Sequence, residues 1–391
     1  MKKVNFGLVG VGNRGVYGYL KTLKEYFPEE ARFIALSDSN EGRLKKVSEE
    51  LGGNFRLFSN YKEMLSLPEV DAVVITTPDF THEEITIDAL QAGKHVICEK
   101  PLAITAKGCN RVIQASIKAK KVLQLGLVLR YSPFYQKLKK LIEKKTIGEV
   151  KIISMLDYYS GGKTYFRRWN RFKKNTGGLL IHKGCHAFDI LNWLVDSSPE
   201  RVASFGGLDV FKSNPQKPLR CRDCKEKYTC HGSAFLDSKS VEKAKKMGYS
   251  DFDLCLWNSE KDTHDNDTVI IEYKNKVRVN YTECLFPVRS TRYYSIIGDK
   301  GEIEADSASN QIKVYSLSSQ DVVIYNIGPS ISGHGGGDKI LLDDFFNCLR
   351  EGKEPLANGE AGKLSVLIGL AAEKSIEEKR IIKISEIEDN F

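Results

Sequence analysis

Lys100 is the first residue whose position suggests chemistry, because it follows "HVIC" (95–98), a predicted buried strand, and lies between Glu99 and Pro101. In a parallel α/β sheet ligands bind beyond the carboxyl ends of the strands, so this amine would face a ligand. It can bind a substrate hydroxyl and take its proton if burial or a nearby cation lowers its pKa. Pro101 would fix the backbone, and a cis peptide would turn the amine inward. The alternative is an ordinary surface Glu-Lys pair before a helix.

A glycine-rich turn near the N-terminus predicts a site for a dinucleotide. The sequence "GVGNRG" (10–15) follows an apolar run and precedes a helical stretch, which is the context that such a turn needs. Gly10 permits the tight turn, Gly12 leaves room for a pyrophosphate, and Gly15 lets helix and strand approach closely. Asp38 ends the second predicted strand, where a carboxylate binds a ribose 2′-hydroxyl and repels a 2′-phosphate. The pattern therefore predicts NAD rather than NADP.

Alternating strand and helix patterns in the first third of the chain would position these residues. Apolar runs predict strands at 4–10, 32–38, 55–58, 71–78, 95–98 and 122–126. Amphipathic or capped segments between them predict helices, for example over 41–52 and 82–93. Short connections in this order are typical of a doubly wound parallel sheet with helices on both faces. We therefore expect an α/β, Rossmann-type NAD-binding domain over residues 1–126.

Strands dominate the rest of the chain, which we predict to be a second domain over residues 127–391. A strand is expected at 149–159, and two hairpins are expected to turn at 274–276 and 298–301.

Two histidines follow a basic, aromatic loop at 165–172 in this second part. His182 and His186 are four residues apart in sequence, a spacing that puts both on one face of a helix. Guanidinium groups and aromatic faces suit a polyol or an acidic sugar, so the loop could line a pocket for such a ligand with Arg167, Arg168, Trp169 and Asn170. The alternatives are a packed core histidine and a surface loop that turns its rings inward.

An insertion at about 212–262 carries a cluster of cysteines. Three thiols with Cys-x₂-Cys-x₅-Cys spacing and one more downstream could complete a tetrahedron, the candidates being Cys221, Cys224, Cys230 and Cys255. His231 is a weaker candidate because it adjoins Cys230. We expect a structural zinc ion here, with free thiols or an iron–sulfur cluster as the alternatives.

Composition bounds the function further. The chain has 391 residues and a net charge of +8, but its lysines are dispersed along amphipathic segments without interleaved aromatic residues, which argues against nucleic-acid binding. No apolar run approaches the length of a membrane span, and the N-terminal run reads as a strand rather than a signal peptide. Nine cysteines without an export signal argue against disulfides. We expect a cytoplasmic protein.

Taken together, the motifs resemble those of the Gfo/Idh/MocA family, which includes glucose–fructose oxidoreductase and inositol dehydrogenase. The resemblance rests on segments in the family's order, at 7–15, Asp38, 76–84, 92–103 and 177–194. It implies a C-terminal domain on a large, mostly antiparallel open sheet, a catalytic Lys100, and His186 assisting proton transfer. It also implies that the domain over residues 127–391 binds the substrate and self-associates into a homodimer or homotetramer. The matched segments name further cofactor-binding candidates: Asn13, Arg14, Thr77, Pro78, His82 and Glu99.

One departure from the family's pattern concerns the substrate. The family's second motif usually begins with an acid, and here it begins with His182, which can donate, accept or carry charge. A substrate with an anionic or bulky substituent becomes more plausible than a plain inositol. The candidate substrate-binding residues are His182, Arg168, Trp169 and Arg130.

Three functions remain open at this level. The leading one is an NAD-dependent dehydrogenase for a secondary hydroxyl of a sugar, sugar acid or cyclitol. A second is an NAD-dependent glycosidase that oxidises the sugar transiently and eliminates the aglycone. The third is a sensor that binds NAD without turnover, which the presence of both Lys100 and His186 disfavours.

Overall fold

The computed structural model describes residues 3–246, 248–328 and 334–388. Its contacts divide the chain into two units, Met1–Pro133 with Ser330–Val366, and Phe134–Pro329 with Leu367–Phe391. The first unit thus includes a late segment that the sequence placed in the second domain. Among the described residues, no helix combines the length and the apolar character needed to cross a bilayer.

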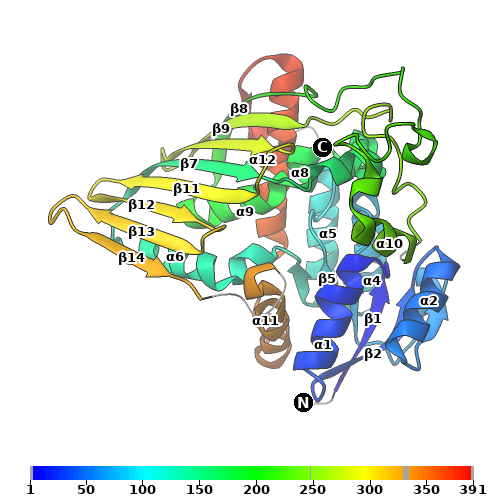
Figure 1. Ribbon diagram of the computed structural model, residues 1–391. Helices are drawn as coiled ribbons and strands as arrows, with labels where there is room; N and C mark the ends of the chain where they lie inside the picture. The colour runs from blue at the N-terminus through cyan, green and yellow to red at the C-terminus, as the bar shows by residue number, and fades with distance from the viewer. Residues whose placement is uncertain (1–2, 247, 329–333, 389–391) are drawn as a thin grey trace. The chain divides into compact units, whose positions relative to one another are not determined.

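The described part of the first unit is built on a six-stranded parallel sheet in the order β3-β2-β1-β4-β5-β6 (Figure 1). Its strands are β1 (Val4–Val9), β2 (Ala31–Ser37), β3 (Arg56–Phe58), β4 (Ala72–Ile75), β5 (His95–Cys98) and β6 (Leu123–Leu125). Its helices include α1 (Lys21–Tyr26), α2 (Glu41–Leu51), α3 (Tyr61–Leu65), α4 (His82–Gln91), α5 (Ala106–Ala119) and α11 (Gly337–Glu351). The strand order and the parallel pairing confirm the predicted doubly wound sheet.

Local sequence explains most of these elements. Every residue of β1 and β4 is buried, as expected of strands that are covered on both faces. Asn40 and Thr105 cap α2 and α5 through their side chains. The helix after the glycine-rich turn differs from expectation, because its first part, η1 (Arg14–Leu20), is wound as a π-helix. Helix α11 belongs to this unit because Phe345 and Phe346 pack on Phe6 of β1.

The second unit is built on a nine-stranded sheet, counted over the described residues, in the order β14-β13-β12-β11-β7-β10-β9-β8-β15. Its strands are β7 (Val150–Tyr158), β8 (Pro199–Gly207), β9 (Asn266–Tyr273), β10 (Arg278–Cys284), β11 (Thr291–Gly298), β12 (Gly301–Asp306), β13 (Gln311–Ser316), β14 (Val322–Asn326) and β15 (Ile382–Lys383). Strands β7 and β10 pair in parallel and the other described pairs are antiparallel. The mostly antiparallel sheet and both predicted hairpins, β9–β10 and β11–β12, are thus confirmed.

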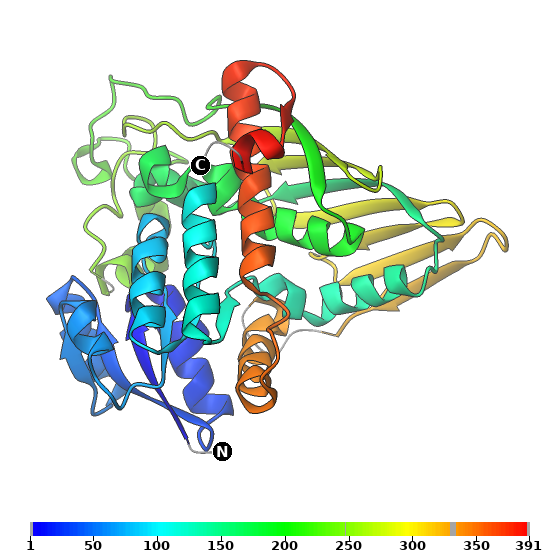
Figure 2. The same ribbon diagram turned by 180° about the vertical axis from the view of Figure 1, so that it is seen from behind.

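Helices cover one face of this sheet (Figure 2). They include α6 (Pro133–Glu143), α8 (Leu179–His182) and α9 (Gly184–Val195), with α7 (Lys173–Thr176) and α13 (Ser385–Glu388) nearby in the same unit, while α12 (Gly359–Glu378) is shared between the two units. Tyr135 of α6 packs on Tyr294 of β11, and Phe188 of α9 packs on Tyr281 of β10. Residues alternate between buried and exposed along the strands, so the other face is open.

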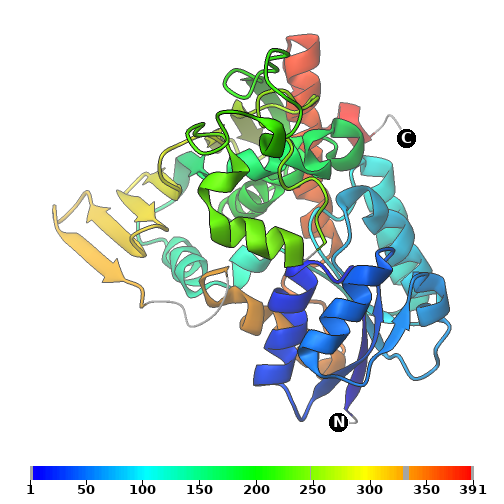
Figure 3. The same cartoon turned by 45° about the vertical axis from the view of Figure 1, so that its right-hand side comes forward.

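The insertion between β8 and β9 is largely irregular, and its described residues include the short α-helix α10 (Ser238–Lys246) and two 3₁₀ turns, η6 (Cys221–Asp223) and η7 (Ala234–Leu236) (Figure 3). A bridge between Arg220 and Leu254 draws its two ends together.

Candidate functional site

The glycine-rich turn closes against the end of β4. Gly10 has a φ of 89°, and a Cβ atom there would lie 2.8 Å from the Thr76 carbonyl carbon. A Cβ atom on Gly15 would lie 2.5 Å from the Gly10 carbonyl oxygen. Among the described residues, the Asn13 side-chain oxygen is buried without a hydrogen-bond partner, which leaves this amide for a ligand. The turn therefore fits the pyrophosphate of a dinucleotide, because only glycine allows this close approach.

Asp38 lies at the carboxyl end of β2 and is tied to the same turn. Its Oδ2 accepts a hydrogen bond of 2.9 Å from the Val11 amide, and its Oδ1 accepts one of 2.9 Å from the Asn40 amide. Arg43 of α2 lies 3.1 Å from this carboxylate, a neighbour that the sequence did not single out. The backbone and Arg43 thus fix the carboxylate beside the turn, where the ribose of a bound dinucleotide is expected.

The segments after β4 and β5 form the next part of this edge of the sheet. Thr77 and Pro78 follow β4, and the Thr81 hydroxyl donates to the Pro78 carbonyl at 2.7 Å. Lys100 follows β5, and the Lys100–Pro101 peptide is cis, one of the conformations that the proline left open. Strands β4 and β5 are neighbours, so Thr77, Pro78 and Lys100 lie along one edge with the glycine-rich turn.

Glu99 is held by charged and polar neighbours from distant parts of the chain. Arg14 Nε lies 2.5 Å from Glu99 Oε1, and Arg14 Nη1 lies 2.7 Å from Asp338 Oδ1. The Tyr19 hydroxyl donates to Glu99 at 2.7 Å, and Glu99 also fills the space in which a Cβ on Gly126 would lie. Burial raises the pKa of Glu99, but the Arg14 guanidinium and the Tyr19 hydrogen bond outweigh it and hold that pKa below its usual value.

Arg14 and Glu99 therefore bind each other, although the sequence named both as cofactor contacts. The two other members of this cluster were missed. Tyr19 lies on the helix after the turn, and Asp338 ends the segment "HGGGD", which the sequence indicated only through its resemblance to the family's closing region. The cluster orients the residue that immediately precedes Lys100.

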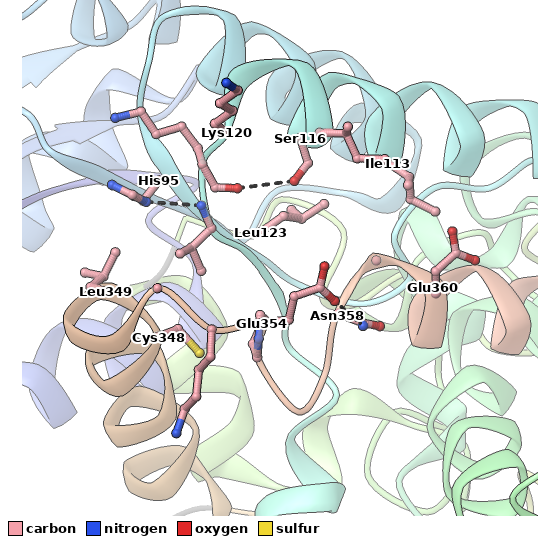
Figure 4. Close-up of a pocket in the computed structure, with 17 residues that line it drawn as sticks. His95, Ile113, Ser116, Lys120, Leu123, Cys348, Leu349, Glu354, Asn358 and Glu360 are labelled. Atoms are coloured by element: carbon pink, nitrogen blue, oxygen red, sulfur yellow. Dashed lines mark hydrogen bonds between the residues drawn. The ribbon is translucent and has the colours of Figure 1, made fainter.

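A cavity of about 390 Å³ lies elsewhere in the first unit (Figure 4). His95 and Leu123, the first residues of β5 and β6, line it together with Glu354 and Asn358. Burial and the nearby Lys121 lower the pKa of His95 to about 4, so its ring is neutral near pH 7. This cavity is at the amino ends of the strands, opposite the edge at which α/β sheets bind their ligands.

The histidine motif in the second unit spans two helices. His182 ends α8, and His186 lies in the first turn of α9, with Lys183 at the break between them. The His186 amide donates to the Lys183 carbonyl at 3.3 Å. A single residue, Lys183, interrupts the helical segment that carries both histidines, and its backbone stays in the right-handed helical region at φ −99° and ψ −47°. That the two histidines share one face stays a prediction.

His182 is enclosed by the preceding aromatic loop. Asn170 Nδ2 lies 2.9 Å from His182 Nε2, and the rings of Tyr165 and Trp169 meet the imidazole edge to face at 5.2 and 5.5 Å between centroids. Asn170 was among the loop residues expected to line a pocket, whereas Tyr165 was not singled out. The structure thus brings Trp169 and His182 together, as the sequence suggested.

The two candidate arginines have other neighbours. The Arg168 guanidinium lies 4.8 Å from the centre of the Tyr249 ring in the insertion. Arg130 belongs to the first unit, where it is buried and donates to the Leu356 carbonyl at 3.1 Å. Neither placement indicates a substrate contact.

A buried ionic cluster lies behind the histidine motif. Lys183 Nζ lies 2.7 Å from Asp157 and 3.4 Å from Glu283, and these side chains are 4%, 2% and 0% exposed. Arg292 lies 3.2 Å from Asp157, and the Tyr281 hydroxyl donates to Glu283 at 2.8 Å. Burial and the nearby Asp157 raise the pKa of Glu283 to about 7, although Lys183 opposes that shift. The sequence gave no signal for this cluster beyond the presence of Lys183 in the motif.

The expected zinc site is not formed. Among the described residues, no three His, Cys, Asp or Glu side chains are placed to hold a metal ion, and the candidate ligands Cys221, Cys224, Cys230 and Cys255 are free cysteines. Instead the buried guanidinium of Arg167 donates to the Leu254 and Gly232 carbonyls and lies beside thiols of this cluster. The Arg167 guanidinium thus places a positive charge beside these thiols. The Trp257 indole N–H donates a hydrogen bond to the Cys230 sulfur at 3.3 Å.

Comparisons with known proteins agree with this architecture. Residues 4–127 match the model "Oxidoreductase family, NAD-binding Rossmann fold", and residues 139–384 match "Oxidoreductase family, C-terminal alpha/beta domain". The putative oxidoreductase YteT of Bacillus subtilis is 29% identical, over 99% of both chains. The myo-inositol 2-dehydrogenase of Thermotoga maritima is 25% identical, over 98% of this chain and 99% of its own. A levoglucosan dehydrogenase solved with NADH and levoglucosan shares the fold, with a TM-score of 0.77, 20% identity and coverage of 98% and 100%.

Proposed function

The chain belongs to the Gfo/Idh/MocA oxidoreductase family, and from that premise we propose that it is an NAD(H)-dependent dehydrogenase of a secondary hydroxyl on a sugar, sugar acid or cyclitol. One observation carries the proposal. The glycine-rich turn after β1 and Lys100 after β5 lie at the same edge of one parallel sheet, where such folds bind dinucleotides. The curated relatives that act on inositol support the substrate class.

Residues of the first unit would bind different parts of the dinucleotide. The turn at Gly10, Gly12 and Gly15 holds the pyrophosphate, Asn13 offers its amide, and Asp38 binds the adenosine ribose. Thr77 and Pro78 border the same edge. A bound nicotinamide supplies the hydride acceptor.

Lys100 would bind the substrate hydroxyl and take its proton while hydride leaves the same carbon. Arg14 and Tyr19 bind the Glu99 carboxylate, which fixes the residue that precedes this amine. His186 would assist the proton transfer, and His182 with Trp169 would contact the substrate. Arg130 and Arg168 are weaker candidates for substrate binding, given their present neighbours.

A turnover assay tests the proposal. The purified protein is incubated with NAD⁺ and a panel of sugars, sugar acids, cyclitols and glycosides, and NADH is followed by its absorbance. Replacing Lys100 with Ala should lower kcat/KM by roughly 10²- to 10⁴-fold, the usual contribution of a general base. Lys107→Ala, an exposed lysine on α5, is the matched control and should keep the parent rate.

Other outcomes would redirect the assignment. Released aglycone without net NADH would support the glycosidase instead. NAD binding with no turnover, or a Lys100→Ala variant as active as the parent, would support a sensor.

We also propose that the protein forms a homodimer or homotetramer through the open face of the nine-stranded sheet. Apolar side chains lie exposed on that face, including Ile152 of β7, Phe205 of β8 and Ile270 of β9, and the Phe205 side chain is 81% exposed. A patch of this kind commonly marks an interface between proteins. Light scattering should give a dimer or tetramer mass, and Phe205→Glu should lower it.

A further inference from the structure

His82 lies at the start of α4 with its ring 1% exposed and both ring nitrogens facing backbone carbonyls. Nδ1 is 2.7 Å from the Pro101 carbonyl oxygen, and Nε2 is 2.9 Å from the Thr77 carbonyl oxygen. A carbonyl oxygen can only accept a hydrogen bond, so each ring nitrogen must donate. Neutral imidazole has one N–H group, and only the imidazolium has two. The geometry therefore requires a protonated ring.

A nearby carboxylate can balance this buried charge. It belongs to Asp79 from η2 (Asp79–Thr81), which is buried, and the Cys98 side chain from β5 is a further neighbour of the ring. From the α4–α5 pair, Cys109 lies near Cys98, and Glu83 is paired with Arg111 at 2.6 Å. Burial lowers the pKa of His82, but Cys98, Asp79 and the Pro101 carbonyl outweigh it and raise that pKa to about 10. The ring should therefore keep its charge across the physiological range.

The two carbonyls that His82 joins belong to the segments that form the candidate site. Thr77 follows β4, and Pro101 follows β5 directly after Lys100. Hydrogen bonds from a charged donor are shorter and roughly twice as strong as neutral ones. We propose that His82 is a positioning residue, held as an imidazolium, which clamps these two segments together and thereby fixes the direction of Lys100. Its protonation state follows from the geometry alone, while its kinetic role rests on the proposed function.

Nitrogen-15 NMR of the full-length protein tests the protonation state without any substrate. Near neutral pH, both ring nitrogens of His82 should resonate as protonated nitrogens, and they should titrate only near pH 10. The chain has seven histidines, so the signals are assigned by their loss in His82→Gln. His95 in the same unit is the internal control, because its ring should be neutral under the same conditions. A His82 ring that loses a proton below about pH 7, as an unperturbed histidine does, would overturn the proposal.

Kinetics test the positioning role. Gln at position 82 has a single donor nitrogen in place of two and loses the charge, so we expect kcat to fall roughly 10- to 100-fold, the effect of a misplacement of about 1 Å at a reacting group. The dissociation constant for NAD⁺ should change less than about threefold, which is less than the loss of a typical hydrogen bond to the cofactor would cause. If His82→Gln keeps the parent kcat, the positioning role is wrong. If the parent oxidises no substrate but its His82 ring is doubly protonated, the proposed function fails and the protonation state stands.

Discussion

Replacing Lys183 with Met should destabilise the second unit strongly, since Lys183 is buried between two carboxylates. Its amine lies 2.7 Å from Asp157 and 3.4 Å from Glu283. Removing one partner of a buried ion pair usually costs about 3–5 kcal/mol. Asp157 keeps Arg292 at 3.2 Å, and Glu283 can escape its charge by binding a proton, so we expect the lower end, about 3 kcal/mol near pH 8.

Thermal unfolding measures this loss directly. For a unit of this size each kcal/mol shifts Tm by roughly 2–4 °C, so Lys183→Met should unfold about 6–12 °C below the parent. Near pH 5.5 the difference should shrink, because Glu283, with a pKa of about 7, is then already protonated in the parent. Lys151→Met, at an exposed lysine on β7, is the matched control and should stay within about 0.5 kcal/mol.

A second variant separates the lost ion pair from lost packing. Lys183→Met combined with Glu283→Gln removes the uncompensated carboxylate, so it should recover part of the stability near pH 8. A Lys183→Met protein that unfolds within about 1 kcal/mol of the parent near pH 8 would refute the argument. So would a double variant that is less stable than Lys183→Met.

Two further predictions concern a pH dependence and the cofactor. The pKa of Glu283 is raised from 4.5 to about 7, so the native state binds the Glu283 proton more tightly than the unfolded chain does. The stability that this proton contributes is present below pH 4.5 and is lost as the pH rises through 7. The Glu283→Gln variant does not lose this stability. In urea titrations its free energy of unfolding, relative to that of the parent, should therefore rise by about 3 kcal/mol between pH 4.5 and 8. A difference that stays constant over this range would contradict the raised pKa. Asp38→Ala should weaken NAD⁺ binding about 10- to 100-fold in fluorescence titrations, the range for a hydrogen bond to a charged group, and unchanged affinity would remove Asp38 from the site.

The parallel sheet and the glycine-rich turn of the first unit could be predicted closely, because the residues that specify them lie near one another in the sequence. Gly10, Gly15 and Asp38 take their roles from the strand and turn that contain them, and both steric requirements of the glycines are met in the structure. Short apolar runs bounded by helices specify a parallel sheet with little ambiguity. Pro101 itself left a cis peptide open, and the structure has it.

Partners supplied by distant segments were not predictable. Asp338 reaches Arg14 only because α11 packs on β1, and no pattern around position 14 indicates an acid so far along the chain. Asp157 and Glu283 lie on β7 and β10, which pair in parallel although they are far apart in sequence. The helical spacing of His182 and His186 did not predict the interruption at Lys183 between them. The cysteine spacing predicted ligands, but Arg167, from another segment, lies among the thiols.

In each unit an ionic cluster lies beside a residue of a sequence motif. We infer that these clusters serve to orient the motif residues rather than to stabilise the fold. Arg14 binds Glu99 beside Lys100, and Lys183 binds Asp157 and Glu283 beside His182. A buried ion pair adds little over a well-packed apolar group of the same volume, yet it costs much to break. What charged hydrogen bonds do provide is a fixed geometry for the groups that they join. An apolar repacking of the Lys183 cluster that preserved Tm should therefore still lose activity, because the break between α8 and α9 that places the two histidines would no longer be held.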